Sequence, residues 1–375
     1  MSFEIRYPKA VKLLESAVSE GIAPGFVAGV FSASEPEHID LVARGCRRLA
    51  MKGLKQLPME IDTVFDIASI TKIFCTTPLV ARMIDRGWLR WSSPVRHYLP
   101  EFRYDSVTVE HLLTHSSGLP AWAPFYESIR EAYSGQHLET IPINDRKSLM
   151  KKLVYAIDLE NSPGTKTVYS DLGFLLLGWI IEEITQSDLN RAADAMLWFD
   201  DYAGPYFVHT DQAAFAARKD HVAATEDCPW RGLLQGQVHD DNSWSMGGVS
   251  GHAGVFATAK DLMMFGRRLL VDRFLTADTL KKMWTKSDLP QGSTRTLGWD
   301  TPSGAIPSIG QYFSKNSVGH LGYTGTSLWI DLDRGIAVTL LSNRVHPTRQ
   351  NEKIKEFRSR FHDLLAIDLL KNVTR

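Results

Sequence analysis

The stretch "FDIASITKIF", residues 65–74, decides the fold assignment, because an apolar extended run gives way there to a helical pattern. Ser69 precedes Lys72 by three positions, a spacing that puts two side chains on one face of a helix. A serine hydroxyl becomes a good nucleophile when a neighbouring base takes its proton, and lysine can do so if burial or positive charge favours its neutral form. N–H groups at a helix start can also hold a developing oxyanion. The stretch is therefore a candidate active site.

The chain holds a second copy of this spacing, so spacing alone decides nothing. In "KSLMKKL" Ser148 precedes Lys151 by three, within a charged stretch where lysines face water. The alternative for Ser69 is a helix cap followed by a solvated Lys72. However, Ser69 follows an apolar strand and precedes "IFCTTPLVARMI", which places Lys72 near the core. A buried charge is costly unless it is paired or has a specific role. We therefore expect Ser69 in the active site and Ser148 on the surface.

Composition describes a globular protein without special partners. The 375 residues include 42 basic and 43 acidic side chains, and the charge of −1 gives no electrostatic case for nucleic acid or an anionic membrane. The longest apolar run, "GFLLLGWII", is about half of a membrane span, and the N-terminus lacks the apolar core of a signal peptide. We expect a cytoplasmic protein without a membrane span, or a periplasmic one if a leader was removed. Three widely spaced cysteines form no disulfide framework or metal pair.

Strands are expected at both ends of the chain and helices between them. After an amphipathic helix at 8–21, "GFVAGVFSA" and "HIDLVARGCRRL" are typical of strands, as are "TSLWIDL" and "GIAVTLLSN" near the C-terminus, before a final helix. The second strand of that late hairpin is apolar enough to be central in a sheet. Helices are expected between the two groups of strands, at 70–86 with a distortion at Pro78, 107–114, 145–157, 170–186 and 259–270.

This order predicts an α/β protein. An antiparallel sheet built from residues 1–68 and 286–375, flanked by N- and C-terminal helices, would receive a mainly helical insertion at 69–285. The long irregular segment 198–245 is either a functional loop or a family insertion.

Two further segments combine with Ser69. In "SPGTKTVYSDLGFLLLGWIIEEI", Tyr169 and Asp171 stand at the entrance to an apolar helix, which alone could be a simple cap. In "GHLGYTGTSLWID", Gly322 and Gly325 are expected on a strand whose backbone something approaches closely, or at an edge bulge. Each segment taken alone is ambiguous.

Together these segments resemble the serine β-lactamase and penicillin-binding-protein superfamily, in particular its class C β-lactamase, D,D-peptidase and esterase branch. That superfamily carries Ser-x-x-Lys with Ser-Asp-Asn and Lys-Thr-Gly. The branch has Tyr-x-Asn in the second place, and many relatives have His-x-Gly in the third. "VTVEHLLTHSSGLP" and "GGVSGHAGVFATAKDLMMF" also look like family segments, in family order.

The resemblance implies a role for each matching residue. Ser69 would be the acylated nucleophile and Lys72 its base or proton relay. Tyr169 would hydrogen-bond the nucleophile and shuttle protons to the leaving group and the deacylating water. The backbone N–H groups of Ser69 and of Tyr323, just after Gly322, would form the oxyanion hole. No metal or organic cofactor is implied.

Two positions depart from the family pattern. Asp171 stands where relatives usually have an asparagine that helps to recognise an acylamide, and it can only accept hydrogen bonds when ionised. It would favour protonated Lys72 and move the general-base role towards Tyr169. His320 stands where β-lactamases usually have a lysine for the substrate carboxylate, and histidine is largely neutral above about pH 6.5. Arg344 is the candidate to replace that anchor.

Other polar groups have weaker claims. Ser250 near His252 hints at a Ser-His hydrolase, but "GVSGH" lacks the second glycine of a nucleophile elbow. His115 is expected to be a hydrogen-bonded structural residue. The histidine-rich and aspartate-rich segment matches no zinc spacing and is either part of the active-site rim or purely structural; its members are His239, Asp240, Asp241 and Asn242.

The sequence thus predicts a serine hydrolase that acts through an acyl-enzyme on Ser69. Its expected substrates are small esters or D-amino-acid-containing amides, including peptidoglycan fragments, with weak β-lactamase activity left open. The alternatives are a true β-lactamase or D,D-carboxypeptidase, and a non-catalytic binding or scaffold protein with the same fold. Preference would depend on 198–245 and on residues around 118–135. We expect a monomer that binds a small molecule or short peptide.

Overall fold

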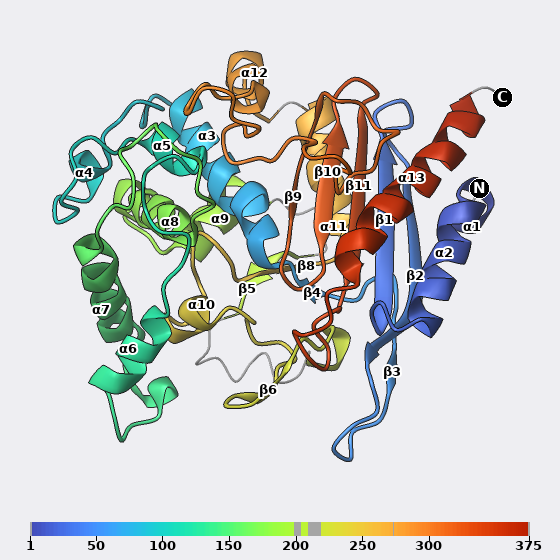
Figure 1. Ribbon diagram of the computed structural model, residues 1–375, viewed down its shortest axis with the longest axis horizontal. Coiled ribbons are helices and arrows are strands. Elements are labelled where there is room, and N and C mark those ends of the chain that lie inside the picture. Colours follow the sequence, from blue (N-terminus) through green and yellow to red (C-terminus); the bar gives the residue numbers. More distant parts are fainter. Residues whose placement is uncertain (1, 199–203, 209–218, 273, 374–375) are drawn as a thin grey trace.

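The computed structural model describes residues 2–198, 204–208, 219–272 and 274–373, so parts of the 198–245 segment lie outside the described residues. A sheet half and a helical half lie side by side (Figure 1). The N-terminal elements are α1 (Phe3–Arg6), α2 (Pro8–Ser19), β1 (Gly25–Ser32), β2 (Ile39–Arg48), β3 (Leu57–Pro58) and β4 (Phe65–Asp66). The next are α3 (Thr77–Asp85), α4 (Val95–Tyr98), α5 (Val109–Leu113), α6 (Phe125–Ala132), α7 (Ile143–Ala156), α8 (Asp171–Thr185) and α9 (Leu189–Met196).

The remaining elements return the chain to the sheet. The first group is β5 (Tyr206–Phe207), β6 (Asp227–Cys228), β7 (Gly232–Leu233), α10 (Asp241–Ser245), β8 (Val255–Ala257), α11 (Ala259–Arg267) and α12 (Ala277–Trp284). The last group is β9 (Ser317–Leu321), β10 (Ser327–Asp331), β11 (Ile336–Ser342) and α13 (Ile354–Val373). Within the described ranges no helix is long and apolar enough to cross a membrane.

The six-stranded sheet joins the two ends of the chain. Its order is β3-β2-β1-β11-β10-β9 with antiparallel neighbours, so an N-terminal strand pairs with a C-terminal one at the centre. Val30 on β1 is paired with Val338 on β11, and Leu328 on β10 is paired with His320 on β9. This confirms the predicted fold class, in which an antiparallel sheet built from both termini is combined with helices.

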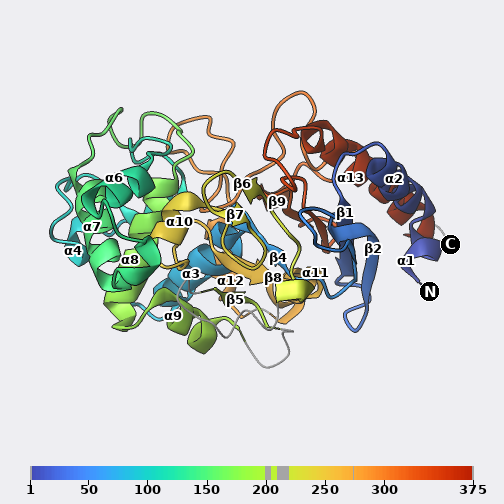
Figure 2. The ribbon, with the colours of Figure 1, turned by 90° about the horizontal axis from the view of Figure 1, so that it is seen from below.

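The alternation of side chains explains why β1 and β11 are apolar throughout. On β1, Phe26 and Val30 belong to a core under α1, α2 and α13, whereas Val27 and Phe31 belong to the core on the opposite face. The three helices lie along one side of the sheet (Figure 2), and Asp368 of α13 accepts the Lys9 N–H of α2 at 2.8 Å. A strand covered on both faces needs apolar residues at every position, as predicted for β11.

Helix α11 covers the other face of the sheet, although the sequence analysis assigned its residues to the helical insertion. It packs against β1 and β11. Small residues permit the close approach: a Cβ on Gly266 would lie 2.5 Å from the Cβ of Ala337, and one on Gly29 would lie 3.0 Å from Cγ of Met263. A helical pattern reveals which face is apolar but not which element that face covers. The division at residues 68 and 285 stays a prediction.

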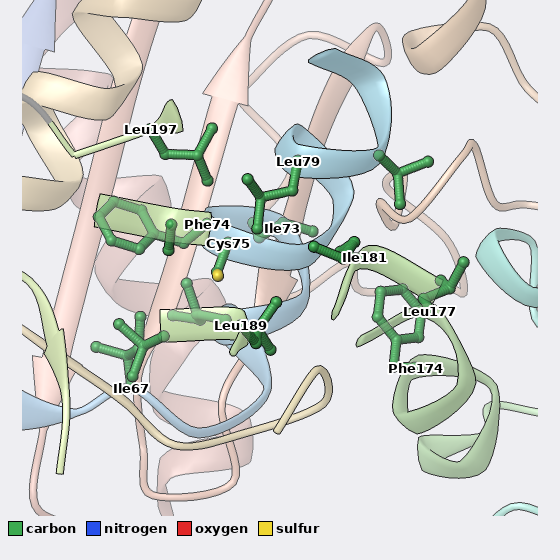
Figure 3. Close-up of a cluster of buried hydrophobic side chains, with 14 of the residues drawn as sticks. Ile67, Ile73, Phe74, Cys75, Leu79, Phe174, Leu177, Ile181, Leu189 and Leu197 are labelled. Atoms are coloured by element: carbon green, nitrogen blue, oxygen red, sulfur yellow. The ribbon is translucent and has the colours of Figure 1, made fainter. Parts of the chain in front are cut away.

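The helical half is organised around α8, whose residues 172–181 are all buried. Figure 3 shows side chains from the segment that follows Ser69 meeting those of α8 and α9 in one apolar cluster. The residues that it labels are Ile67, Ile73, Phe74, Cys75, Leu79, Phe174, Leu177, Ile181, Leu189 and Leu197. This packing fixes the position of the chain on both sides of the candidate nucleophile.

Candidate active site

Ser69 lies where the two halves meet, at the end of a short strand. β4 pairs with β8 and leads into a 3₁₀ turn, Ala68–Ile70. Ala68 has a φ of 48°, a left-handed value that is uncommon for a residue with a side chain. Its N–H donates to Oδ1 of Asp66 at 2.9 Å, while Oδ2 of Asp66 accepts the His239 N–H at 2.7 Å. The buried Asp66 carboxylate therefore holds the strained residue directly before Ser69.

Lys72 is placed by three separate elements. A π-helical turn, Lys72–Thr76, precedes α3, so the irregularity predicted at Pro78 comes one turn earlier. The lysine is 0% exposed, and its Nζ lies 3.2 Å from Oγ of Ser69, 2.7 Å from Oδ1 of Asp171 and 3.0 Å from the carbonyl of His252. The structure thus brings together a serine and a lysine that the sequence could only place on one face.

Tyr169 and Asp171 reach the site from the start of α8. The Ser170 hydroxyl accepts the Gly173 N–H, so it caps this helix and leaves Asp171 as its first residue. A carboxylate there is favoured by the helix dipole. The ring of Tyr169 lies 4.9 Å from Nζ of Lys72. The sequence motif is therefore both a cap and a part of the site.

The charges of these groups depend on one another. Burial alone would lower the pKa of Lys72, but Asp171 and Tyr169 together outweigh it, and the pKa is raised. Burial also raises the pKa of Tyr169, against the opposing effect of Lys72. Asp171 thus favours protonated Lys72 as expected, whereas burial works against the ionised form of Tyr169, and the base role expected of Tyr169 stays a prediction.

A turn between β9 and β10 closes the site from the C-terminal side. β9 ends at Leu321, so Gly322 and Gly325 lie in this turn, and their predicted place on a strand was wrong. The close approach is real, since a Cβ on Gly322 would lie 2.5 Å from the carbonyl oxygen of Ile67. The hydroxyl of Thr326 donates to that same carbonyl at 3.1 Å. The N–H of Tyr323 has no hydrogen-bond acceptor among the described residues, which suits an oxyanion-hole donor.

His320 and Arg344 lie beside this turn but present no free positive charge. Burial lowers the pKa of His320 to about 4, its Nδ1 donates to the Leu321 carbonyl at 2.8 Å, and its Nε2 has no hydrogen-bond partner in the described part of the chain. Arg344 donates to the carbonyls of Tyr323, Arg349 and Asn351. Its guanidinium holds the backbone of the turn and is already committed, so the arrangement does not support it as a carboxylate anchor.

Two cavities flank the nucleophile, and both are lined by Ser69, Tyr169 and Tyr323. The first, here named the Asp171 cavity, has a volume of about 330 Å³, and its other lining residues include Trp122, Asp171, Asp240, Asp241, His252 and Arg349. The second, here named the His320 cavity, has a volume of about 370 Å³, and its other lining residues include Asp300, His320, Arg344, Glu352, Lys355 and Arg358. A bound substrate could thus extend to either side of Ser69.

Comparison with known proteins decides the family. The family model described as Beta-lactamase matches residues 26–360. The chain belongs to the Beta-lactamase family. This confirms the predicted superfamily, and the protein is a serine hydrolase of the β-lactamase and penicillin-binding-protein fold.

Relatives of this Beta-lactamase family member carry different names. The chain is 27% identical over 324 residues to the "Putative D-alanyl-D-alanine carboxypeptidase" of Salmonella agona (strain SL483), and the alignment covers 78% of this chain and 72% of the relative. EstCE1, a hydrolase with promiscuous acyltransferase activity, superposes with a TM-score of 0.72 at 19% identity over 97% of this chain and 99% of its own. The octameric penicillin-binding protein homologue from Pyrococcus abyssi gives 0.69 at 20% identity over 97% and 77%. The monomeric state expected here stays a prediction.

The remaining polar residues of this Beta-lactamase family member divide between rim and support. His239, Asp240 and Asp241 line the Asp171 cavity, as one of the two interpretations of that segment predicted. Ser250, His252 and Asp240 form a hydrogen-bonded row, with 3.1 Å from Oγ to Nδ1 and 2.9 Å from Nε2 to Oδ1. Ser250 is buried and lines neither cavity. These hydrogen bonds therefore stabilise the loop whose His252 carbonyl accepts the hydrogen bond from Lys72.

His115 and the second Ser-x-x-Lys pair lie outside the cavities. Nδ1 of His115 accepts the Ser170 N–H at 3.0 Å, which agrees with a structural role, and its ring lies 4.6 Å from that of Tyr169. Ser148 and Lys151 belong to α7, where Nζ of Lys151 lies over the Trp179 ring. In the described part of the chain no group of three or more His, Cys, Asp and Glu side chains could hold a metal ion.

Sequence reasoning missed several site residues of this family member. Asp66 was overlooked although it stands three residues before Ser69, where an acidic residue inside an apolar run is itself a signal of a specific role. Trp122 and Arg349 line the Asp171 cavity from loops that carry no periodic pattern. No signal in the sequence pairs such loop residues with a nucleophile far along the chain.

Proposed function

We propose that this protein hydrolyses small esters or D-amino-acid-containing amides, including peptidoglycan fragments, through an acyl-enzyme on Ser69. The observation that carries the proposal is the 3.2 Å contact between Oγ of Ser69 and Nζ of a fully buried Lys72. A binding protein would not need to bury a charged lysine against a serine, because burying a charge is costly unless it is paired for a purpose.

The proposed reaction has two halves. Oγ of Ser69 bonds to the substrate carbonyl carbon, and its proton passes through Lys72 and Tyr169 to the leaving oxygen or nitrogen as the C–O or C–N bond breaks. The N–H groups of Ser69 and Tyr323 would stabilise the oxyanion. Water then attacks the acyl-enzyme, gives up its proton along the same route, and releases the acid with free Ser69.

The His320 cavity argues against a substrate whose recognition depends on a carboxylate. The relative from Salmonella agona carries a carboxypeptidase name, and β-lactams also bear a carboxylate. Here His320 is neutral above about pH 4, and Arg344 and Arg358 are engaged with backbone carbonyls. The remaining cation among the described lining residues, Lys355, is paired with Glu352 at 2.8 Å. We therefore rank esters and amides without a carboxylate above β-lactams and D,D-peptides as substrates.

Intact-protein mass measurement tests the nucleophile. Incubation with p-nitrophenyl acetate or with penicillin G should add the mass of the acyl group to the wild-type protein and none to Ser69→Ala. The matched control is Ser148→Ala, which removes the other Ser-x-x-Lys serine and should acylate like the wild type. An adduct on Ser69→Ala, or turnover that Ser69→Ala retains, would show that the nucleophile lies elsewhere.

A further inference from the structure

The Asp171 cavity has a charge distribution that bears on the acyl group. Three carboxylates line it, from Asp171, Asp240 and Asp241, whereas Arg349 alone among its described lining residues carries a permanent positive charge. That guanidinium is already bound, because its Nε lies 2.8 and 2.7 Å from the two carboxylate oxygens of Glu226. Asp171 and Asp241 are paired with Lys72 and Arg231 at 2.7 Å each. The cavity therefore presents carboxylate oxygens as hydrogen-bond acceptors towards Ser69 rather than uncompensated negative charge.

Asp171 contacts Lys72 beside Ser69, and only one of its two carboxylate oxygens takes part in that contact. Its Oδ1 accepts from Lys72 at 2.7 Å, while its Oδ2 has no donor among the described residues. The side chain is 19% exposed, so this second oxygen is open to the cavity. An ionised carboxylate can only accept, so a group of the substrate that meets it must donate.

An aromatic ring completes the environment of a cation. Trp122 and Tyr323 also line the cavity, and they are 47% and 51% exposed. The Tyr323 ring already has the Arg344 guanidinium 4.5 Å from its centroid and the His239 ring stacked on it at 5.5 Å. Trp122 is therefore the side chain whose π-face a ligand cation could contact. An acylamide carbonyl would instead bring an acceptor towards the acceptor Asp171.

We infer that Asp171 and its cavity recognise an acyl group carrying a protonated amine. The substrates would then be esters or amides of amino acids whose amino group is free, rather than N-acylated compounds. This inference rests on the proposed function, since it concerns the acyl group that Ser69 would receive. It deepens that function by naming the charge that the substrate must carry.

Binding of such a substrate would also prepare Lys72 for catalysis. The ammonium shares Asp171 with Lys72 and brings a second positive charge close to it. Both changes lower the pKa of a lysine, so they favour release of the Lys72 proton. The preference for the amine should therefore be present in kcat as well as in KM.

A matched pair of substrates tests the inference. Alanine p-nitroanilide, as its D or L enantiomer, and propionyl p-nitroanilide differ only by the amino group. N-acetylalanine p-nitroanilide is a third compound, in which that amino group is acetylated and cannot be protonated. We expect kcat/KM for the free amine to exceed that for either comparison compound by about tenfold or more, the effect of one charge-assisted hydrogen bond. The preference should decline above about pH 8, where the amine loses its proton.

Variants assign the effect to Asp171. Asp171→Asn should reduce the ratio between the free amine and propionyl p-nitroanilide by about tenfold. The matched control, Asp145→Asn, removes the same charge from the exposed surface of α7 and should leave that ratio unchanged. Because the pH test uses the wild-type protein, the inference stays testable if Asp171→Asn does not fold.

The outcomes separate the inference from the proposed function. Ser69-dependent turnover with a ratio at or below one overturns the inference and leaves the hydrolase intact. A preference that persists unchanged above about pH 8, or in Asp171→Asn, overturns it as well. If neither the anilides nor p-nitrophenyl propionate is turned over in a Ser69-dependent way, the proposed function fails and the inference fails with it.

Discussion

Asp66 shows how one side chain can set the geometry of a nucleophile. Its two oxygens accept the N–H groups of Ala68 and His239, which come from segments 171 positions apart (239 − 68). A left-handed φ at Ala68 costs energy and persists only where its surroundings hold it. Thr324 adds to this support, because its hydroxyl donates to the Asp66 carbonyl at 2.8 Å.

Replacing Asp66 with alanine should weaken both the fold and the acylation step. Two buried N–H groups would lose their acceptor, at about 1–3 kcal/mol each, and Ala68 could relax away from its strained conformation. We expect a lower midpoint of urea unfolding and slower formation of the p-nitrophenyl acetate adduct. The control is Asp62→Ala, an exposed aspartate four residues earlier. Wild-type acylation in a folded Asp66→Ala protein would contradict a positioning role.

His320 leads to a prediction about pH and stability. Its pKa in the folded protein is lowered to about 4 by burial, below the value of about 6.5 for an unfolded histidine. Between these two values the unfolded chain binds the extra proton, so the free energy of unfolding falls as pH falls. The loss amounts to about 1.4 kcal/mol per pH unit for one histidine.

Replacing His320 with asparagine removes the titrating ring but keeps a donor for the Leu321 carbonyl. We expect the slope of unfolding free energy against pH to decrease by about one proton between pH 6 and pH 4.5. Urea unfolding at several pH values measures this slope. An equal slope in both proteins would mean that His320 takes up its proton alike in the folded and unfolded states.

At the scale of elements, the loop between α10 and β8 connects α8 to Lys72. The carbonyl of His252 accepts from Lys72, and that of Gly251 accepts from the Thr76 hydroxyl at 2.6 Å. This loop lies directly on α8: a Cβ on Gly251 would lie 2.1 Å from the carbonyl oxygen of Phe174 and 3.0 Å from the backbone nitrogen of Gly178. Glycine is needed here because the two backbones almost touch.

Gly251→Ala should therefore push the loop off α8 and disturb Lys72. We expect a destabilisation of about 1–3 kcal/mol, as for other overpacked cores, together with slower acylation. Gly173→Ala, on α8, is the matched control, because a Cβ there lies 3.5 Å or more from its nearest neighbours, which are atoms of Leu112 on α5. Thermal unfolding and adduct formation measure the two effects. Equal stability of Gly251→Ala and the wild type would show that the loop can shift freely.

At the scale of the whole molecule, the site lies at the junction of the two halves. The N-terminal part delivers Ser69 and Lys72, the helical half delivers Tyr169, and the C-terminal hairpin delivers the turn with Tyr323. Helix α13 holds that turn from behind, since Arg358 donates to the carbonyls of Gly322 and Thr326 at 3.1 Å each. Any change in how the halves meet must alter the distances around Ser69.

The sequence by itself determined the fold class and the family, and it predicts Ser69 rather than Ser148 as the nucleophile. Periodicity of apolar residues reports local structure, and the order of short motifs survives without knowledge of distances. Thus the strands at both ends, the apolar α8 and the place of Asp171 and His320 beside Ser69 could all be predicted. These features depend on neighbours along the chain or on motif order.

Only the tertiary structure decided what the groups of the site do to one another. The hydrogen bond from His239 to Asp66, the packing of α11 on the sheet and the commitment of Arg344 to carbonyls join distant segments that share no pattern. The raised pKa values of Lys72 and Tyr169 and the free Oδ2 of Asp171 depend on burial and on distances of a few ångströms. Electrostatic effects change steeply with such distances, and a sequence contains none of them.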